Sequence, residues 1–479
     1  MATKVLVIGG GLAGLATAAA LAPRGFEVTL LESRNRLGGR ASSFQDVASG
    51  QLVDTCQHVS MGCCTNFAHF CRTLGIAHLL QTQDCLYFMT VDRHLSRFRA
   101  DRWPAPLHLA RSFLSAHFLS ADDKWRIAYG LACLRANHGR NDPPFRDWLK
   151  QHRQTPRTIE RFWGLVLTSA LNETPERIGL RYARKVFLDG FLRHRRGFEI
   201  ELPTVPLGRL YGEELQAWLG KHGVQVRLPM PARRFLIDGK VCGLELRNGE
   251  ILTADWYLAA VPFDRLLELL PERTVAEQPY FANLRRLETS PITSVHLWYD
   301  RPVLHLPHVV LVGCVGQWLF NRGPVGCVDG GPVGCVGGEE NPTLGAQKAS
   351  PPTHPTRSSG QYLQVVVSAA RQFRGLGHDE VERQVRMELE RLLPQIRAAR
   401  LIRARVITEH AATFSAVPGV DRWRPAQASP IDNLLVAGDW TATGWPATME
   451  GAVRSGYLVA ECLLQKLGRP EEVVQPDLG

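Results

Sequence analysis

Three glycines near the start of the chain have the spacing that binds the pyrophosphate of a dinucleotide. Gly9, Gly11 and Gly14 follow an apolar run at residues 4–8 and open an alanine-rich run at residues 12–22. The first glycine permits a tight turn, the second lets phosphate oxygens approach the backbone, and the third lets helix and strand pack closely. Free N–H groups at the N-terminus of the helix then attract the phosphates.

An acidic residue stands where the ribose of such a dinucleotide would lie. A second apolar run, residues 27–31, leads into Glu32. A carboxylate at this point accepts hydrogen bonds from ribose hydroxyls and repels a 2′-phosphate. Because strand, turn, helix, second strand and acid occur in this order, we predict an adenine-dinucleotide site rather than a glycine-rich turn without a ligand.

Two further segments favour a flavin over a nicotinamide. Residues 38–40, Gly-Gly-Arg, would bring bare backbone and a guanidinium group to a phosphate. Near the C-terminus an apolar run ends in Gly438 and Asp439, and a helix is predicted to begin near Pro446. The N-terminus of that helix would stabilise the negative charge that collects on a reduced flavin ring. A simple Rossmann dehydrogenase needs neither segment.

The composition indicates a globular protein that does not bind nucleic acid. The chain has 479 residues, 45% hydrophobic and 21% charged, enough for two domains of ordinary size. The net charge of +10 comes mainly from arginines in every region, whereas nucleic-acid binding gathers them on one face. One dense basic cluster, within residues 181–196, is interpreted as a solvated helical face or as a surface for an anionic membrane.

Cysteine usage and hydropathy predict a cytoplasmic protein. The 11 cysteines form no C-x-x-C pair and no cleavable leader precedes the first apolar run, so we expect reduced thiols. V-G-C-V repeats within residues 312–336 lack histidines at usable spacing, and we predict no metal site. No apolar run approaches the ~18 residues that span a bilayer, so any membrane contact is expected to be peripheral, at the inner face.

The predicted fold class is α/β, with a Rossmann-like FAD-binding domain that is discontinuous in sequence and interleaved with an α+β substrate domain. The substrate domain is expected to contain a mixed sheet and helices. The predicted FAD-binding parts are residues 1–85, 206–265 and 426–479; the predicted substrate-domain parts are residues 86–205, mostly helical, and 266–425.

Turn and periodicity patterns place the other elements. Asp-Gly at 238–239 and Asn-Gly at 248–249 are typical of hairpin turns, so residues 224–260 are predicted as a β-meander. A helical pattern covers residues 105–137, with Ser120 as an N-cap. Strands are predicted at residues 294–299, 362–367 and 401–408, a helix at 379–393, and a flexible insertion at 323–360, which is rich in Gly, Pro, Ser and Thr.

Longer motifs resemble a known family. The chain resembles the amine oxidase and phytoene desaturase superfamily of FAD enzymes through VIGGGLAGL, E-x-R-x-R-L-G-G-R and VAGDW…GWPATMEGAVRSG. Within it, the chain is similar to the squalene-associated FAD-dependent desaturases, the hydroxysqualene dehydroxylase family of squalene and hopanoid biosynthesis, through QHVSMGC, SVHLWYDRPV, QWLFNRG and GDWTATGWPATMEGAVRSG. The similarity covers the chain except residues 323–360.

The resemblance implies non-covalent FAD and assigns cofactor contacts along the chain. It gives the pyrophosphate to Gly9, Gly11, Leu12, Ala13 and Gly14, the ribose to Glu32, adenine to the backbone of Ala232, and the phosphate and ribityl region to Gly38, Gly39, Arg40, Gly438 and Asp439. Arg34 belongs to the same cofactor motif, Thr448 and Met449 would lie under the flavin ring, and Gln57 and His58 would approach the ring from the substrate side.

One loop departs from the family pattern. The family has Asp-Asn-Gly-Gln-His where this chain has Asp-Thr-Cys-Gln-His at residues 54–58. Because Cys56 replaces a glycine, the backbone of the loop is more restricted. The resemblance therefore does not fix where His58 lies against the flavin.

The resemblance implies that hydride from reduced FAD replaces the allylic hydroxyl of hydroxysqualene and gives squalene and water. A long apolar pocket would hold this lipophilic isoprenoid, and His58 is the candidate acid for the leaving hydroxyl. The sequence does not identify the electron donor. A carotenoid-type desaturase, an amine oxidase and a non-catalytic nucleotide-binding protein stay open as alternatives, although no cysteine stands at residues 438–439 for a covalent flavin link.

Overall fold

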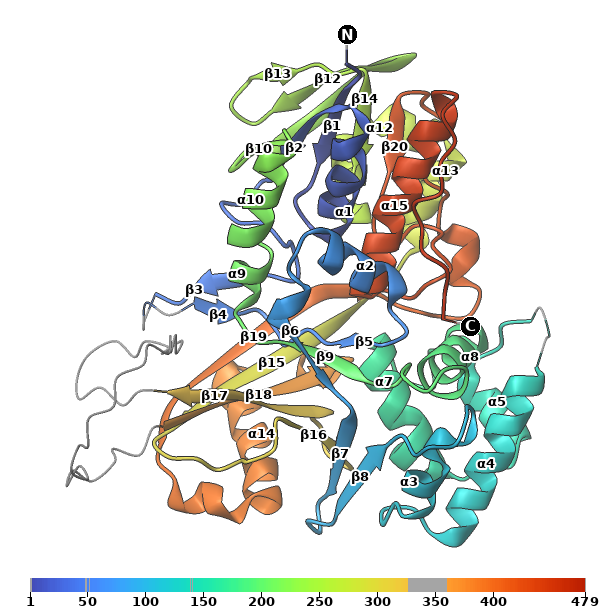
Figure 1. The fold of residues 1–479 in the computed structure, drawn as a ribbon, viewed down its shortest axis with the longest axis vertical. Coiled ribbons are helices and arrows are strands. Elements are labelled where there is room, and N and C mark those ends of the chain that lie inside the picture. Colours follow the sequence, from blue (N-terminus) through green and yellow to red (C-terminus); the bar gives the residue numbers. More distant parts are fainter. Residues whose placement is uncertain are drawn as a thin grey trace, which may run out of the picture.

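The chain forms a parallel sheet at one end, a larger mixed sheet at the other, and a group of helices beside the mixed sheet (Figure 1). The computed structural model describes residues 2–47, 50, 52–137, 139, 141–325 and 360–478. Each large sheet takes strands from distant parts of the chain. The predicted α/β class, with a mixed second sheet, is confirmed.

The parallel sheet surrounds the glycine turn. Its strand order is β10-β2-β1-β14-β20, where β1 is Lys4–Ile8, β2 Glu27–Leu31, β10 Gln225–Arg227, β14 Trp256–Ala259 and β20 Leu434–Val436. Helix α1 (Leu12–Leu21) is buried along its whole length and packs against α15 (Met449–Lys466). The Cβ of any other residue at Gly456 of α15 would lie 2.4 Å from the Ala13 carbonyl oxygen, so a glycine is needed for this close approach.

The predicted meander is correct at its centre and wrong at its ends. Three antiparallel strands, β11 (Ala232–Asp238), β12 (Lys240–Leu246) and β13 (Ile251–Leu252), form a small sheet whose turns contain Gly239 and Gly249 in the left-handed region. However, β10 and β14 pair in parallel with β2 and β1. Strand β14 has a continuous apolar run buried on both faces, which is typical of a parallel sheet rather than of a meander.

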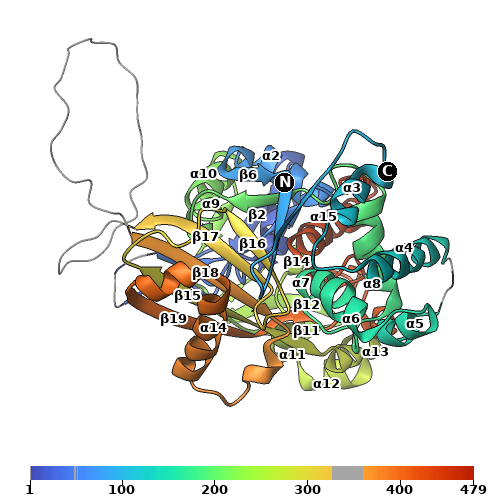
Figure 2. The ribbon, with the colours of Figure 1, turned by 90° about the horizontal axis from the view of Figure 1, so that it is seen from below.

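The mixed sheet has seven strands in the order β19-β15-β18-β17-β16-β7-β8. These are β7 (Cys85–Thr90), β8 (Leu95–Arg99), β15 (Thr289–Tyr299), β16 (His308–Val312), β17 (Trp318–Val325), β18 (Gly360–Ser368) and β19 (Leu401–Phe414). Helix α14 (His378–Leu392) covers one face and ends before Pro394 (Figure 2). The strands predicted within β15, β18 and β19 and this helix are confirmed.

The predicted insertion begins and ends in strands. Strand β17 extends to Val325 and β18 begins at Gly360, so the bounds 323 and 360 are wrong. Strand pairing explains this difference, because Pro324 and Val325 lie opposite Gln361 and Gly360. Residues 326–359 of the predicted insertion lie outside the described residues.

The helical stretch predicted at 105–137 is divided. Helix α3 (Ala110–Leu114) ends before a turn that buries Ala116 and Phe118, and α4 (Ala121–Ala136) begins after the predicted cap. Ser120 accepts from the backbone of Asp123 while the Asp123 side chain accepts from the backbone of Ser120, which is a capping box. The helical group continues with α5 (Phe145–Gln151), α6 (Pro156–Thr158), α7 (Leu165–Leu171) and α8 (Leu180–Phe187).

Shorter elements join the two halves. Two small sheets contain β3 (Ser43–Gln45) with β4 (Leu52–Asp54), and β5 (Ser60–Met61) with β9 (Ile200–Pro203) and β6 (Leu80–Gln83). The other helices are α2 (Thr65–Thr73), α9 (Leu207–Leu210), α10 (Glu213–Lys221), α11 (Phe263–Leu269), α12 (Glu272–Glu277) and α13 (Pro279–Ala282).

Candidate active site

The three glycines of the first turn have three different surroundings. Gly9 has φ +111°, and a Cβ there would lie 2.4 Å from the Ala260 carbonyl oxygen. A Cβ at Gly14 would lie 1.9 Å from the Gly9 carbonyl oxygen, so close packing requires glycine. At Gly11 the nearest atom to a Cβ is 3.9 Å away, which leaves the backbone open to a ligand. This open cradle at the N-terminus of α1 fits a pyrophosphate.

The Gly-Gly-Arg loop packs directly against this turn. Gly38 has φ +94° and donates its N–H to the Gly10 carbonyl at 2.8 Å. Gly39 has φ +61°, and a Cβ there would lie 3.0 Å from the Gly11 Cα. The two glycine segments therefore line one cradle, and side chains would fill it.

Glu32 lies beside the glycine turn of this cradle. Its two carboxylate oxygens accept from the backbone N–H groups of Gly10 and Arg34, both at 2.8 Å. Its carbonyl accepts from Met230 at 2.7 Å, which brings the start of β11 and Ala232 beside it. Carboxylate lone pairs are still left for a ribose hydroxyl. The side chain of Arg34 is exposed, so only its backbone faces Glu32.

Arg40 and Asp439 connect the first and last parts of the cradle. The Arg40 guanidinium lies 2.7 Å from the Asp439 carboxylate and donates to the Ala412 carbonyl at 2.7 Å. Burial opposes the charge of Arg40, but the nearby Asp439 carboxylate outweighs it, and the pKa of Arg40 is raised. Gly438 donates its N–H to the Ser455 hydroxyl of α15 at 2.9 Å. A fixed cation thus lies beside a backbone segment held by α15, where a phosphate or ribityl chain would bind.

Arg424 holds the loop that carries Asp439, and no sequence motif had pointed to it. Its buried guanidinium donates to the Asp439 carbonyl at 2.9 Å and to the Thr443 hydroxyl at 3.0 Å. It also contacts the Tyr182 hydroxyl and lies 3.1 Å from Asp421. Since Tyr182 belongs to α8, this arginine fixes the cofactor loop against the helical group.

Asp54 and Arg322 form a buried ion pair between the cradle and the mixed sheet. The Asp54 carboxylate lies 2.6 Å from the Arg322 guanidinium and accepts from the Leu207 backbone at 2.9 Å. Arg322 also donates to the side-chain oxygen of Gln57. The Thr55 hydroxyl donates to the Arg40 carbonyl at 2.9 Å, so the loop spans from the cradle to β17. Arg322 stands in the family-like QWLFNRG segment but had no assigned role.

His58 lies in the same loop as a neutral ring. Its Nδ1 is 3.0 Å from the Cys56 carbonyl oxygen, and burial lowers the pKa of His58. Because a carbonyl only accepts, Nδ1 carries the proton and Nε2 presents a lone pair. Burial also raises the pKa of the Cys56 thiol to about 12, so this cysteine is a protonated thiol at neutral pH.

Thr448 and Met449 mark the true start of the last helix. The helix begins at Met449 and not near Pro446, because Thr448 is the N-cap and its hydroxyl accepts from the Gly451 N–H at 3.0 Å. The Tyr211 hydroxyl lies 3.5 Å from the Met449 sulfur. The prediction that Thr448 and Met449 lie under a flavin ring stays a prediction.

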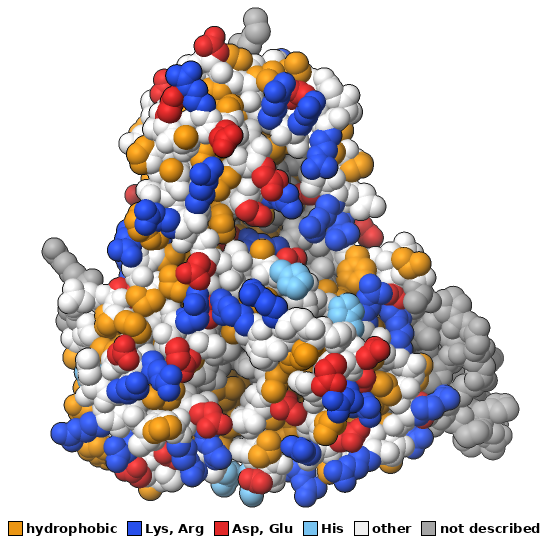
Figure 3. All heavy atoms as spheres, turned by 180° about the vertical axis from the view of Figure 1, so that it is seen from behind, with side chains coloured by type: hydrophobic (Ala, Val, Ile, Leu, Met, Phe, Trp, Pro, Cys, Tyr) orange, Lys and Arg blue, Asp and Glu red, His pale blue; other side chains and the backbone are white. Residues whose placement is uncertain are grey.

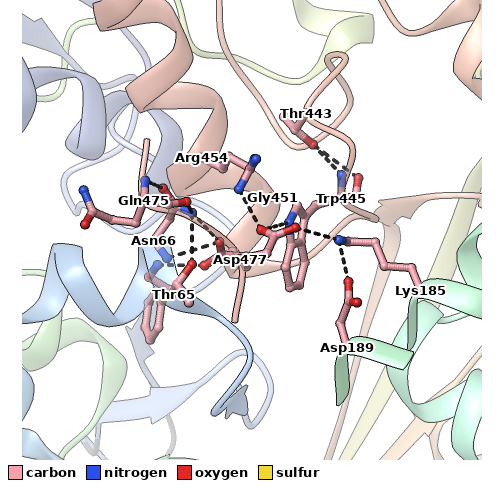
Figure 4. Close-up of polar contacts among 12 residues, drawn as sticks. Thr65, Asn66, Lys185, Asp189, Thr443, Trp445, Gly451, Arg454, Gln475 and Asp477 are labelled. Carbon is pink, nitrogen blue, oxygen red and sulfur yellow. Dashed lines mark hydrogen bonds and ion pairs between the residues drawn. The ribbon is translucent and has the colours of Figure 1, made fainter. Parts of the chain in front are cut away.

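The C-terminal segment fastens the loop before α15 (Figure 4). The Asp477 carboxylate accepts from the Trp445 indole at 3.2 Å, from Arg454 at 3.0 Å and from Lys185 at 3.3 Å. Lys185 also pairs with Asp189 at 2.7 Å. Because Lys185 lies on α8, Asp477 ties the helix N-terminus to the helical group.

The basic residues of the 181–196 cluster are largely paired. Arg181 pairs with Asp421, Arg193 with Asp189, and Arg196 with Glu199. On the face shown in Figure 3, Lys and Arg side chains are dispersed and Asp and Glu lie between them. These observations favour a solvated helical face over a surface that binds an anionic membrane.

Metal-binding and membrane-spanning features can be stated only for the described residues. Within them, no three His, Cys, Asp or Glu side chains gather closely enough to hold a metal ion. The nine cysteines in this part of the chain form no disulfides. None of the helices described is both long enough and apolar enough to cross a bilayer.

Comparisons with known proteins agree with this geometry. Residues 12–464 match the protein family described as "Flavin containing amine oxidoreductase". The chain is 27% identical to 15-cis-phytoene desaturase of Synechococcus elongatus over 97% of this chain and 96% of that protein. It is 29% identical to the chloroplastic/chromoplastic 15-cis-phytoene desaturase of Narcissus pseudonarcissus over 96% of this chain and 79% of that protein.

Solved structures show the same fold. An oxidoreductase from Methanosarcina mazei aligns with a TM-score of 0.68 and 16% identity, over 95% of this chain and 98% of that one. Cyclohexylamine oxidase from Brevibacterium oxydans aligns with a TM-score of 0.65 and 18% identity, over 98% of this chain and 100% of that one. At these identities the likeness concerns the fold alone.

Proposed function

Because this chain belongs to the flavin-containing amine oxidoreductases and is therefore an FAD-dependent oxidoreductase, we propose that it converts hydroxysqualene to squalene. In the balanced reaction, the allylic alcohol and the reduced cofactor give the hydrocarbon, water and oxidised FAD. Bound reduced flavin supplies the hydride that replaces the hydroxyl. The chain's own residues hold the cofactor and the alcohol, exclude water and manage the proton that leaves with the oxygen.

The observation that carries this proposal is the buried pair of Asp54 and Arg322, with Gln57 beside it. A pocket for a hydrocarbon polyene needs no such groups, and burying them costs free energy unless they are paired. Arg322 Nε is buried and has no partner among the described residues, and the oxygen of an alcohol would accept its hydrogen bond. The relatives named as carotenoid desaturases support a lipophilic isoprenoid as the rest of the ligand.

The cofactor contacts in this proposal follow from the cradle. Gly9, Gly11 and Gly14 would hold the pyrophosphate with Leu12 and Ala13, Glu32 the ribose, and Arg40 with Asp439 the phosphate and ribityl region. Arg424 would position Asp439, and Asp477 would position the N-terminus of α15.

His58 is the candidate acid within the proposal. Its neutral ring presents a lone pair at Nε2, so donation of a proton requires the imidazolium form, which burial disfavours. A His58→Gln variant of the reduced holoenzyme should therefore react with hydroxysqualene more slowly than the native protein. Reoxidation of its flavin at the native rate removes His58 from the reaction.

A single-turnover experiment tests the function. Purified holoenzyme is reduced without oxygen, mixed with hydroxysqualene, and followed by flavin absorbance and by extraction of the product. We expect flavin reoxidation and one squalene for each FAD. If the flavin is not reoxidised and no squalene forms, the proposed function is wrong.

Phytoene desaturation is the second candidate, because the curated relatives carry that name. Here the oxidised holoenzyme would take hydrogen from phytoene and its flavin would be bleached. Oxidised enzyme mixed with phytoene, and reduced enzyme mixed with hydroxysqualene, give opposite changes in flavin absorbance. The pair of reactions therefore separates the two functions.

We also propose that this protein is cytoplasmic and contacts the inner face of an anionic membrane peripherally. The membrane would then supply the lipophilic substrate. Exposed apolar side chains support it: Trp103, Leu107, Leu114 and Trp125 lie on and before α3 and on α4. Basic side chains such as Arg111 and Lys124 lie among them. Sedimentation with phosphatidylglycerol vesicles, but not with phosphatidylcholine vesicles, is the expected result.

A further inference from the structure

One row of side chains crosses five strands of the mixed sheet on the face opposite α14. The register places His308 of β16 beside Phe320 of β17, then Gln364 of β18, His296 of β15 and Arg405 of β19. Neighbouring strands lie about 4.8 Å apart, so Gln364 and His296 are in direct reach of one ligand atom. Both side chains are fully buried.

Two atoms at the centre of this row have no hydrogen-bond partner in the described part of the chain: His296 Nε2 and Gln364 Oε1. The other end of each group is held. His296 Nδ1 lies 2.6 Å from the Tyr362 hydroxyl, and the Gln364 amide donates to the Ser294 hydroxyl at 2.7 Å. A buried polar atom left without a partner costs about 1–3 kcal/mol, so two of them side by side call for a ligand.

The rings around His296 fix its orientation. It stacks with Trp298 at 6.1 Å and with Tyr362 at 6.0 Å between ring centroids. If the Tyr362 hydroxyl donates to Nδ1, the free Nε2 carries the proton. The centre of the row then offers one donor, His296 Nε2–H, and one acceptor, Gln364 Oε1. The ring nitrogens of His308 also lack a partner among the described residues, but His308 lies two strands away from Gln364. A hydroxyl group, which both donates and accepts, matches this pair.

The charge of the surroundings disfavours a cationic ligand group. Burial and the nearby guanidinium of Arg322 lower the pKa of His296 to about 3, so its ring is neutral. Arg322 is paired with Asp54, and Arg403 and Arg405 with Asp46. These three guanidinium groups face two carboxylates, so the surroundings carry one excess positive charge, which repels an amine.

The row also adjoins the loop that reaches the cofactor cradle. The Cys56 thiol lies beside Ser294, which holds Gln364, and Gln57 contacts Arg322 on β17. Thr55 of the same loop binds the carbonyl of Arg40. A ligand oxygen at the row would thus lie on the substrate side of the cofactor.

We propose that His296 and Gln364 form the subsite that holds the hydroxyl oxygen of the substrate and so select an isoprenoid alcohol over the corresponding hydrocarbon. This inference rests on the proposed function for the identity of the alcohol. It assigns specificity to two side chains on neighbouring strands: His296 donates a hydrogen bond to the hydroxyl oxygen, and Gln364 Oε1 accepts a hydrogen bond from the hydroxyl group.

Equilibrium binding to the oxidised holoenzyme tests this subsite, because oxidised FAD cannot donate a hydride. Hydroxysqualene and squalene are titrated in detergent micelles and followed by the flavin difference spectrum. The native protein should bind the alcohol at least about tenfold more tightly, as expected for one or two hydrogen bonds. His296→Phe keeps the ring stack and Gln364→Leu keeps the volume. Each should bring the ratio close to one and leave squalene binding unchanged.

His308→Phe is the matched control. His308 is a buried histidine of the same row, in contact with the Tyr87 and Trp318 rings, and its replacement should leave the ratio unchanged. FAD content and far-UV circular dichroism check that each variant folds.

The outcomes separate this inference from the proposed function. A native ratio near one, or a native-like ratio in both His296→Phe and Gln364→Leu, overturns the subsite. Conversion of hydroxysqualene with such a ratio leaves the function standing alone. If the alcohol is bound in a His296-dependent manner but never converted, the subsite stands and the function falls.

Discussion

The two halves of the active site are built by opposite means. The cofactor cradle is made of backbone, since the missing side chain at Gly11 leaves space for a ligand and those at Gly38 and Gly39 let the second loop pack closely. The face of the mixed sheet that adjoins it carries polar side chains on separate strands, the half-buried Arg322 and the buried His296 and Gln364. The cradle therefore depends on missing side chains, and the face of the mixed sheet depends on polar side chains that are present.

This difference in construction determines which substitutions each half tolerates. Adding a methyl group to the cradle blocks it, whereas removing a polar group from the sheet leaves its partner buried and unpaired. The following substitutions test the contrast.

The largest effect is expected from adding a side chain at Gly14. In Gly14→Val, the Cβ would lie 1.9 Å from the Gly9 carbonyl oxygen, so turn and helix must separate and FAD binding should be lost. The ratio of absorbance at 450 and 280 nm measures FAD content. Gly220→Ala, where nothing lies within 4 Å of the new Cβ, should keep full FAD content. Native FAD content in Gly14→Val would contradict the backbone cradle.

The next largest effect is expected on stability, from removing the charge of Arg322 in the mixed sheet. Arg322→Met leaves the Asp54 carboxylate buried without its cation, and we expect the free energy of unfolding to fall by about 3–5 kcal/mol. Urea unfolding measures it.

An exposed pair provides the control for this loss. Arg273→Ala breaks the exposed pair with Glu277 and should leave the free energy of unfolding nearly unchanged. The double variant Asp54→Asn with Arg322→Met should recover part of the stability. Equal losses for Arg273→Ala and Arg322→Met would show that burial of the Asp54 pair is unimportant.

A smaller effect is expected at Arg40, a cation of the cradle. Arg40→Gln removes a guanidinium that lies beside Asp439, and the dissociation constant of FAD should rise roughly tenfold to a hundredfold, as for a lost charge-assisted hydrogen bond. Isothermal titration of the apoprotein with FAD measures it. Unchanged affinity would mean that Arg40 serves the fold through Asp439 and not the cofactor.

The smallest effect concerns the pH dependence of stability. His296 stays neutral in the fold down to a pKa of about 3, whereas in the unfolded chain it takes up a proton near pH 6.5. The unfolded state therefore binds more protons between these values, and stability falls as the pH drops through this window. Relative to His296→Phe, the native protein should lose about 1–2 kcal/mol between pH 7.5 and 5. Parallel pH profiles of the two proteins would instead indicate an exposed or charged His296.

The cradle was predictable because its requirements are local in sequence. Backbone conformation and close approach require glycines at fixed spacing, the acid that follows them and the Gly438-Asp439 segment. These residues can therefore be recognised in the sequence. The start of the last helix was misplaced by a few residues, since the cap at Thr448 and not the proline decides it.

The sheet side was not predictable, because its contacts join residues far apart in sequence. Asp54 and Arg322 are separated by 268 residues, and no local pattern links them. The polar row exists only through the register of five strands. Strands β10 and β14 were misassigned for the same reason: hairpin turns are local, but the choice of sheet is made by distant partners.

The order of strands in the parallel sheet has a consequence for synthesis of the protein. Strand β20 and the segment that contains Asp477 leave the ribosome more than four hundred residues after β1. Domains usually fold from the N-terminal side while the chain is still growing. Here the glycine turn is synthesised early, whereas β20 and α15, which complete the cradle, are synthesised late. A nascent chain therefore has no complete site. Cofactor loading is therefore a step that follows translation.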